Sequence, residues 1–99
     1  SKELGIVLHR KLGEIKDKYP DHLKYVFGKG LLAGLVFMDN DGTKLTDLCN
    51  RIAEKAFQKG LLVVNTGRES IKLAPPLTIN KEALLDGLEV LEESIRESI

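Results

Sequence analysis

The chain has 99 residues, of which 42% are hydrophobic and 30% are charged, the composition of an ordinary globular domain. Its fifteen basic and fifteen acidic residues cancel, so no net charge would attract nucleic acid or an anionic membrane. We expect one domain over residues 1–99, because this length cannot hold a cofactor domain and a substrate domain together.

The first predicted element is an amphipathic helix over residues 2–18. Its apolar side chains recur at spacings of three and four and form one stripe, which consists of Leu4, Val7, Leu8, Leu12 and Ile15. The helix should end near Tyr19, because a residue that precedes proline, here Pro20, is disfavoured in the helical region.

Two strands should follow, over residues 23–27 and 31–38, joined by the turn Gly28-Lys29-Gly30. The second strand is almost wholly apolar, and Gly34 within it indicates that another group approaches the backbone closely. A strand that is apolar on both sides is usually covered on both sides.

A second helix is predicted over residues 45–59, with an inward face of Leu48, Ile52, Ala56 and Phe57. Cys49 lies on the same side, so we expect a buried structural thiol. Because it is the only cysteine, an internal disulfide and a cysteine-based metal site are excluded. A reducing, cytoplasmic compartment is the natural expectation.

Short strands over residues 61–64 and 70–73 should precede a last helix, which opens at Asn80, a good N-cap. Its apolar stripe consists of Leu84, Leu85, Leu88, Leu91 and Ile95. The sequence thus predicts an α+β fold of order α-β-β-α-β-β-α. We expect an about four-stranded, mainly antiparallel sheet with three helices on one face. Nothing obvious in the ninety-nine residues covers the other face.

Local patterns of residues offer little catalytic chemistry. His9 and His22 have no second histidine or cysteine at ligand spacing, so we expect surface residues and no metal site. Residues 39–42 form a turn, because a calcium loop would need glycine and glutamate where Lys44 and Asn50 stand. No arrangement typical of nucleophilic catalysis occurs. We therefore predict no catalytic residue in this chain.

Lys72 and the turn Gly28-Lys29-Gly30 are the candidates for binding. Lys72 stands in a predicted strand that Pro75-Pro76 ends, since proline cannot donate to a strand ladder. A cation at a strand end can bind an anion, although a lysine that merely faces solvent is more common. The turn lies between strands and matches no nucleotide-binding pattern, but such a hairpin can line a site.

Three segments have the order and spacing seen in one known family. They are Gly28-Lys29-Gly30-Leu31-Leu32-Ala33-Gly34, Gly60-Leu61-Leu62-Val63 and Ile71-Lys72-Leu73-Ala74-Pro75-Pro76-Leu77-Thr78-Ile79. With the first and last helices, they resemble the C-terminal segment of the class III aminotransferases, which include the 4-aminobutyrate, ornithine and acetylornithine enzymes. The resemblance extends over essentially the whole chain.

This resemblance implies the small domain of the fold-type I aminotransferase architecture, within a longer, homodimeric enzyme. Such an enzyme uses pyridoxal 5'-phosphate to transfer an amino group from an amine or ω-amino acid, such as 4-aminobutyrate, to a 2-oxo acid. In the family the large domain carries the cofactor and its Schiff-base lysine, so we expect this chain to be inactive alone. Its partners would be that large domain and the two substrates. In the family, the large domain and the N-terminal segment of the longer chain cover the open side of the sheet.

Two positions depart from the family. An arginine that grips a substrate carboxylate typically stands where this chain has Lys72, and another arginine often stands where it has Phe27. Arginine offers a bidentate fork and lysine only a point charge, so carboxylate binding by Lys72 is a hypothesis. The alternative function is a free-standing α+β ligand-binding, regulatory or interaction domain without catalysis. That alternative leaves the segment of residues 72–76 unexplained.

Overall fold

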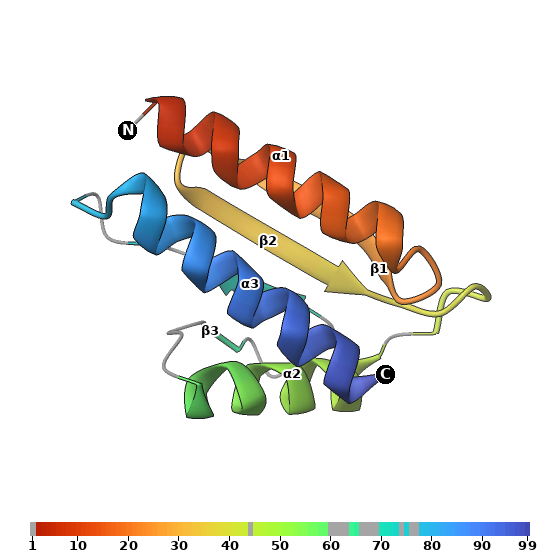
Figure 1. Cartoon of the computed structure of the whole chain (residues 1–99). Coiled ribbons are helices and arrows are strands. Elements are labelled where there is room, and N and C mark those ends of the chain that lie inside the picture. The colour runs from red at the N-terminus through yellow and green to blue at the C-terminus, as the bar shows by residue number, and fades with distance from the viewer. Residues whose placement is uncertain (1, 44, 60–63, 66–69, 74, 76–77) are drawn as a thin grey trace.

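The computed structural model describes residues 2–43, 45–59, 64–65, 70–73, 75 and 78–99. The elements in chain order are α1 (Lys2–Lys18), β1 (Leu23–Lys29), β2 (Leu32–Phe37), α2 (Thr46–Gln58), β3 (Val64–Asn65), β4 (Ser70–Leu73) and α3 (Lys81–Ser98) (Figure 1). Most of the strand predicted over residues 61–64 lies outside the described residues.

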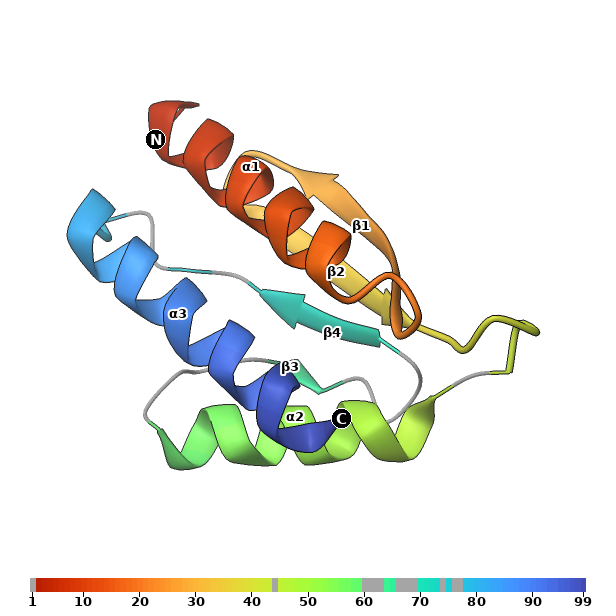
Figure 2. The same ribbon diagram turned by 45° about the vertical axis from the view of Figure 1, so that its right-hand side comes forward.

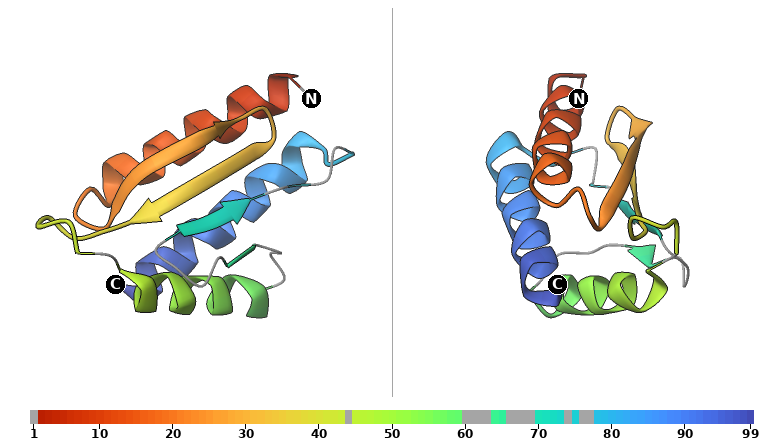
Figure 3. Two further views of the ribbon diagram at one scale, coloured as in Figure 1. Left: turned by 180° about the vertical axis from the view of Figure 1, so that it is seen from behind. Right: turned by 90° about the vertical axis from the view of Figure 1, so that its right-hand side faces the viewer.

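The four strands pair antiparallel in the order β1-β2-β4-β3, and β3 contributes only two residues. Figures 2 and 3 show α1 and α3 over one side of this sheet and α2 along its β3 edge. The α+β class, the three helices and the antiparallel pairing agree with the prediction from sequence. The helices pack on the sheet because each has a single apolar stripe, which it can bury only against a common surface.

The core lies between the helices and one face of the sheet. The strands contribute the buried side chains of Leu23, Ala33, Leu35, Phe37, Ile71 and Leu73. The predicted stripe of α1 is buried except for Leu4, which is half-buried against the core. In α3 the Asn80 side chain accepts a hydrogen bond of 2.8 Å from the Ala83 amide, as its predicted role as N-cap requires.

Helix α2 confirms one inward prediction and corrects another. Cys49 is fully buried together with Ile52 and Ala56. Phe57, which was predicted to face inward, is 68% exposed, so that prediction was wrong. At 3.6 residues per turn, a residue directly after Ala56 is rotated about 100° from it, which carries Phe57 off the buried stripe.

Candidate functional site

The face of the sheet opposite the helices is uncovered by any described element. Because side chains alternate along a strand, the register assigns one set of residues to this open face: Tyr25, Phe27, Lys29, Leu32, Gly34, Val36, Ser70 and Lys72. Three large apolar side chains on it are more than half exposed, namely Tyr25 at 59%, Phe27 at 52% and Leu32 at 63%. Grouped apolar exposure of this kind is typical of surfaces that bind a partner or a ligand.

One row of the open face runs across three strands. Phe27 pairs with Gly34, and Gly34 pairs with Lys72, so the Cα atoms of Phe27 and Lys72 are about 10 Å apart. A Cβ placed on Gly34 would overlap the far end of the Phe27 ring. The close approach predicted at Gly34 is therefore confirmed, and the group that approaches is this ring. It extends from β1 over β2 toward the strand that carries Lys72.

The open face has a positive electrostatic character. Lys72 and Lys29 are both exposed on it, and none of its residues named above is a carboxylate. Lys29 stands opposite Leu32 at the end of the β1–β2 pair, at the rim of the face. An anion on this surface would contact two cations and an apolar wall. No described residue of the face carries a negative charge that would repel it.

The turn predicted at Gly28-Lys29-Gly30 was placed too early, because Gly28 and Lys29 still belong to β1 and pair with Ala33 and Leu32. Gly30 has φ of +60° and Gly28 has φ of +131°, values that side chains with a Cβ rarely adopt. A Cβ on Gly28 would also overlap the carbonyl oxygen of Leu32. Gly30 and Leu31 form the two-residue turn, with positive φ at its first position, as in hairpins of type II′.

His9 is a residue whose role the sequence did not reveal. It was predicted to be a surface residue, but it is half-buried and its Nε2 lies 3.0 Å from the Gly30 carbonyl oxygen. The available signal was its spacing from Gly5, because residues four apart lie on the same face of a helix. Nothing in the sequence indicates that this helix face meets the hairpin.

A groove lies between α1 and α3, away from the open face. This groove has a volume of 220 Å³ and is lined by Lys11, Glu14, Ile15, Lys18, Leu85, Leu88, Glu89 and Glu92. Lys18 lies 2.9 Å from Glu92 across it, and this hydrogen bond raises the Lys18 pKa. Its cations face carboxylates of the same groove, so it offers less to an anion than the open face does.

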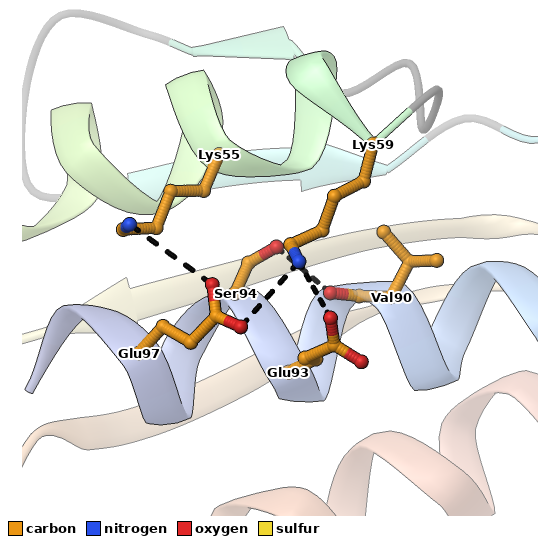
Figure 4. A network of polar contacts seen from close by, with 6 residues as sticks. All are labelled: Lys55, Lys59, Val90, Glu93, Ser94 and Glu97. Atoms are coloured by element: carbon orange, nitrogen blue, oxygen red, sulfur yellow. Dashed lines mark hydrogen bonds and ion pairs between the residues drawn. The ribbon is translucent and has the colours of Figure 1, made fainter.

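Ion pairs also connect α2 to α3. Lys59 contacts Glu93 and, at 3.4 Å, Glu97, while Lys55 lies 4.0 Å from Glu97 (Figure 4). The hydrogen bond from Lys59 lowers the pKa of Glu93, and the same bond raises the Lys59 pKa. These lysines and glutamates neutralise one another at the edge of the helical layer. We therefore assign them a structural role.

The turn at residues 39–43 satisfies its own polar groups. The Asp39 carboxylate accepts hydrogen bonds from the amides of Asp41 and Thr43. Hydrogen bonding to Asp39 and then to Thr43 lowers the Asp41 pKa to about 2. Across the described part of the chain, no three histidine, cysteine or acidic side chains are grouped so as to hold a metal ion. The helices in that part also include none with the length and apolar character needed to cross a membrane.

Pyridoxal phosphate, which the resemblance implies, needs an enclosing site with donors for its phosphate and a lysine for its aldehyde. The two lysines of the open face stand on an uncovered sheet, and both are exposed. The described residues of this face therefore do not enclose such a group by themselves, and a second surface is needed to complete a cofactor site.

Comparison with known proteins identifies the family. The family model for class III aminotransferases matches residues 1–95. The mitochondrial acetylornithine aminotransferase of Saccharomyces cerevisiae is 32% identical to this chain. The match covers 90% of this chain and 19% of the yeast enzyme. The diaminobutyrate–2-oxoglutarate transaminase of Bordetella parapertussis is 38% identical to this chain. That match covers 89% of this chain and 20% of the bacterial enzyme.

The fold agrees with this match. The crystal structure of acetylornithine aminotransferase from Elizabethkingia anophelis superposes with a TM-score of 0.76 at 33% identity, over 97% of this chain and 23% of that one. The chain thus spans about a fifth of the length of the relatives it matches. Matching sequence and matching fold together show that the chain belongs to the class III aminotransferase family.

Proposed function

We propose that this chain is the C-terminal small domain of a longer pyridoxal-phosphate-dependent aminotransferase. The parent would transfer an amino group from an amine or ω-amino acid, of which 4-aminobutyrate is an example, to a 2-oxo acid. The family match over residues 1–95 supports the reaction class. The relative named for diaminobutyrate and 2-oxoglutarate supports an amine donor and a 2-oxo acid acceptor.

In this proposal the open face is the substrate-side wall. The large domain of the longer parent covers this face and contributes the cofactor and the Schiff-base lysine. The supporting observation is the exposed apolar surface of Tyr25, Phe27 and Leu32, because a surface of this kind is stabilised when another surface excludes water from it. The bound cofactor supplies the electron sink for the transfer, and this chain supplies binding groups.

The residue that we assign to substrate binding is Lys72. The observation that carries this assignment is its exposure on the open face, in the same row as Gly34 and the Phe27 ring. Its ammonium group can pair with a substrate carboxylate, while the ring covers the apolar part of the substrate. Burial beneath the large domain would strengthen that ion pair, because the effective dielectric constant falls when water is excluded.

The experiment compares Lys72→Ala, Lys72→Arg and the control Lys81→Ala in the full-length parent, with steady-state kinetics for both substrates. Lys81 is an exposed lysine at the start of α3. Loss of a hydrogen bond to a charged group should raise KM for the acidic substrate roughly 10- to 100-fold. Lys72→Arg should retain binding, because arginine can grip a carboxylate through two bonds.

Unchanged kinetics of Lys72→Ala with both donor and acceptor would remove Lys72 from the site and leave the reaction class standing. A parent without aminotransferase activity toward any amine donor would favour a binding or interaction domain without catalysis instead. The homodimeric state and the cytoplasmic location of the parent stay predictions, and gel filtration and cell fractionation would test them.

A further inference from the structure

The tip of the β1–β2 hairpin is fixed to α1 by contacts that the proposed function does not require. The His9 side chain reaches the Gly30 carbonyl oxygen at 3.0 Å, across 21 positions of sequence. One turn earlier on the same helix face, Gly5 packs against the same residue. A Cβ on Gly5 would lie 3.0 Å from the Cα, the carbonyl carbon and the carbonyl oxygen of Gly30, so only glycine fits without displacement.

The chemistry of the His9 contact is defined by its partner. A carbonyl oxygen can only accept, so Nε2 carries the proton and donates. Leu31, the next residue of the turn, is only 6% exposed, and its side chain joins the core beneath the hairpin. The tip is thus held by a hydrogen bond, by a close backbone contact and by a buried side chain.

This attachment matters because of where the glycines stand. Lys29 lies between Gly28 and Gly30, both with positive φ, and glycine allows the backbone more conformations than any other residue. A hairpin end with this composition would vary in position if it projected freely. Lys29 and Phe27 are already paired with Leu32 and Gly34 of β2. Fixing Gly30 to α1 further limits the movement of this paired hairpin end relative to the helices.

We propose that His9 is a positioning residue for the binding surface: its Nε2–H···O=C bond to Gly30, seated by Gly5, fixes the hairpin tip so that Lys29 and Phe27 face the substrate together with Lys72. The effect on substrate binding rests on the proposed function. The fixed tip itself does not, since the contacts lie within this chain.

The test uses His9→Leu, which removes the donor, and His9→Gln, whose amide nitrogen stands as many bonds from Cα as Nε2 does. The control is His22→Leu, a second half-buried histidine, which lies just before β1 at the opposite end of the hairpin. Hydrogen–deuterium exchange of the peptide spanning residues 27–33 is followed in the full-length parent and in the 99-residue chain. KM and kcat are measured in the parent.

In His9→Leu, exchange at the tip and KM for the 2-oxo acid should both rise roughly 3- to 10-fold, the range for one lost hydrogen bond, with a smaller change in kcat. His9→Gln should restore both, and His22→Leu should change neither. The proposal is overturned if His9→Leu keeps the native exchange at the tip, if glutamine fails to rescue, or if His22→Leu has the same effect. If the parent proves inactive, the proposed function fails, and exchange in the 99-residue chain still decides whether His9 fixes the tip.

Discussion

The two faces of strand β2 have almost the same chemistry and opposite surroundings. Ala33, Leu35 and Phe37 point toward the helices and are buried, while Leu32 on the other face is 63% exposed. Both faces are apolar, so residue type alone does not distinguish them. What distinguishes them is the helical layer, whose three stripes converge on one face only. Folding of this chain therefore relies on one face of the sheet, and the other is available for binding.

The largest expected effect comes from the same substitution on the two faces of β2. Leu35→Ala should lower the free energy of unfolding by about 2–5 kcal/mol, because it leaves a cavity in a packed core. Leu32→Ala, its matched control, should lower it by less than about 1 kcal/mol, because an exposed side chain loses little on truncation. Urea unfolding of the 99-residue chain measures both. Equal losses would mean that the open face is covered in the isolated chain.

A smaller effect is expected on the open face itself, from Gly34→Ala. The new methyl group must displace the Phe27 ring, but the ring is about half exposed and can turn aside. We expect a loss of about 1 kcal/mol, the low end of the range for overpacking. A double-mutant cycle with Phe27→Ala should remove most of this loss. If the loss persists without the ring, the close contact is not its cause.

The smallest effect should come from the charged edge of the helical layer. The pKa of Glu93 is lowered by Lys59, so the contribution of this pair to stability is complete above the Glu93 pKa of the unfolded chain. It is lost as the pH falls through the lower folded pKa. Glu93→Gln should thus reduce the melting temperature slightly at neutral pH, and not at all in strong acid. High salt should shrink the difference further, whereas a difference that grows in acid would contradict the assigned sign.

Local rules were sufficient for much of the fold. The stripe of α1, the cap at Asn80 and the buried thiol of Cys49 follow from spacing and residue type within one helix, and the structure has them as expected. Phe57 was misassigned because the sequence shows an apolar residue beside the stripe, but not the angle at which the stripe meets the core.

The candidate binding surface was harder to predict, because it depends on contacts between distant segments. Lys72 and the glycine turn were recognised as candidates, but their place on one face follows from the pairing of β1, β2 and β4. The Phe27 ring over Gly34 depends on strand register. The His9 contact joins a helix to a turn 21 residues away. No pattern within a single segment contains this information.

The row of Phe27, Gly34 and Lys72 has a consequence for how such a domain can diversify. Its two side chains contribute little to the core, so mutations at Phe27 and Lys72 are tolerated by the folded chain at small energetic cost. A lineage can therefore sample new side chains at these two positions without first acquiring compensating mutations elsewhere. If these two positions contact the substrate as proposed, single amino-acid changes there can alter substrate preference while the fold stays intact.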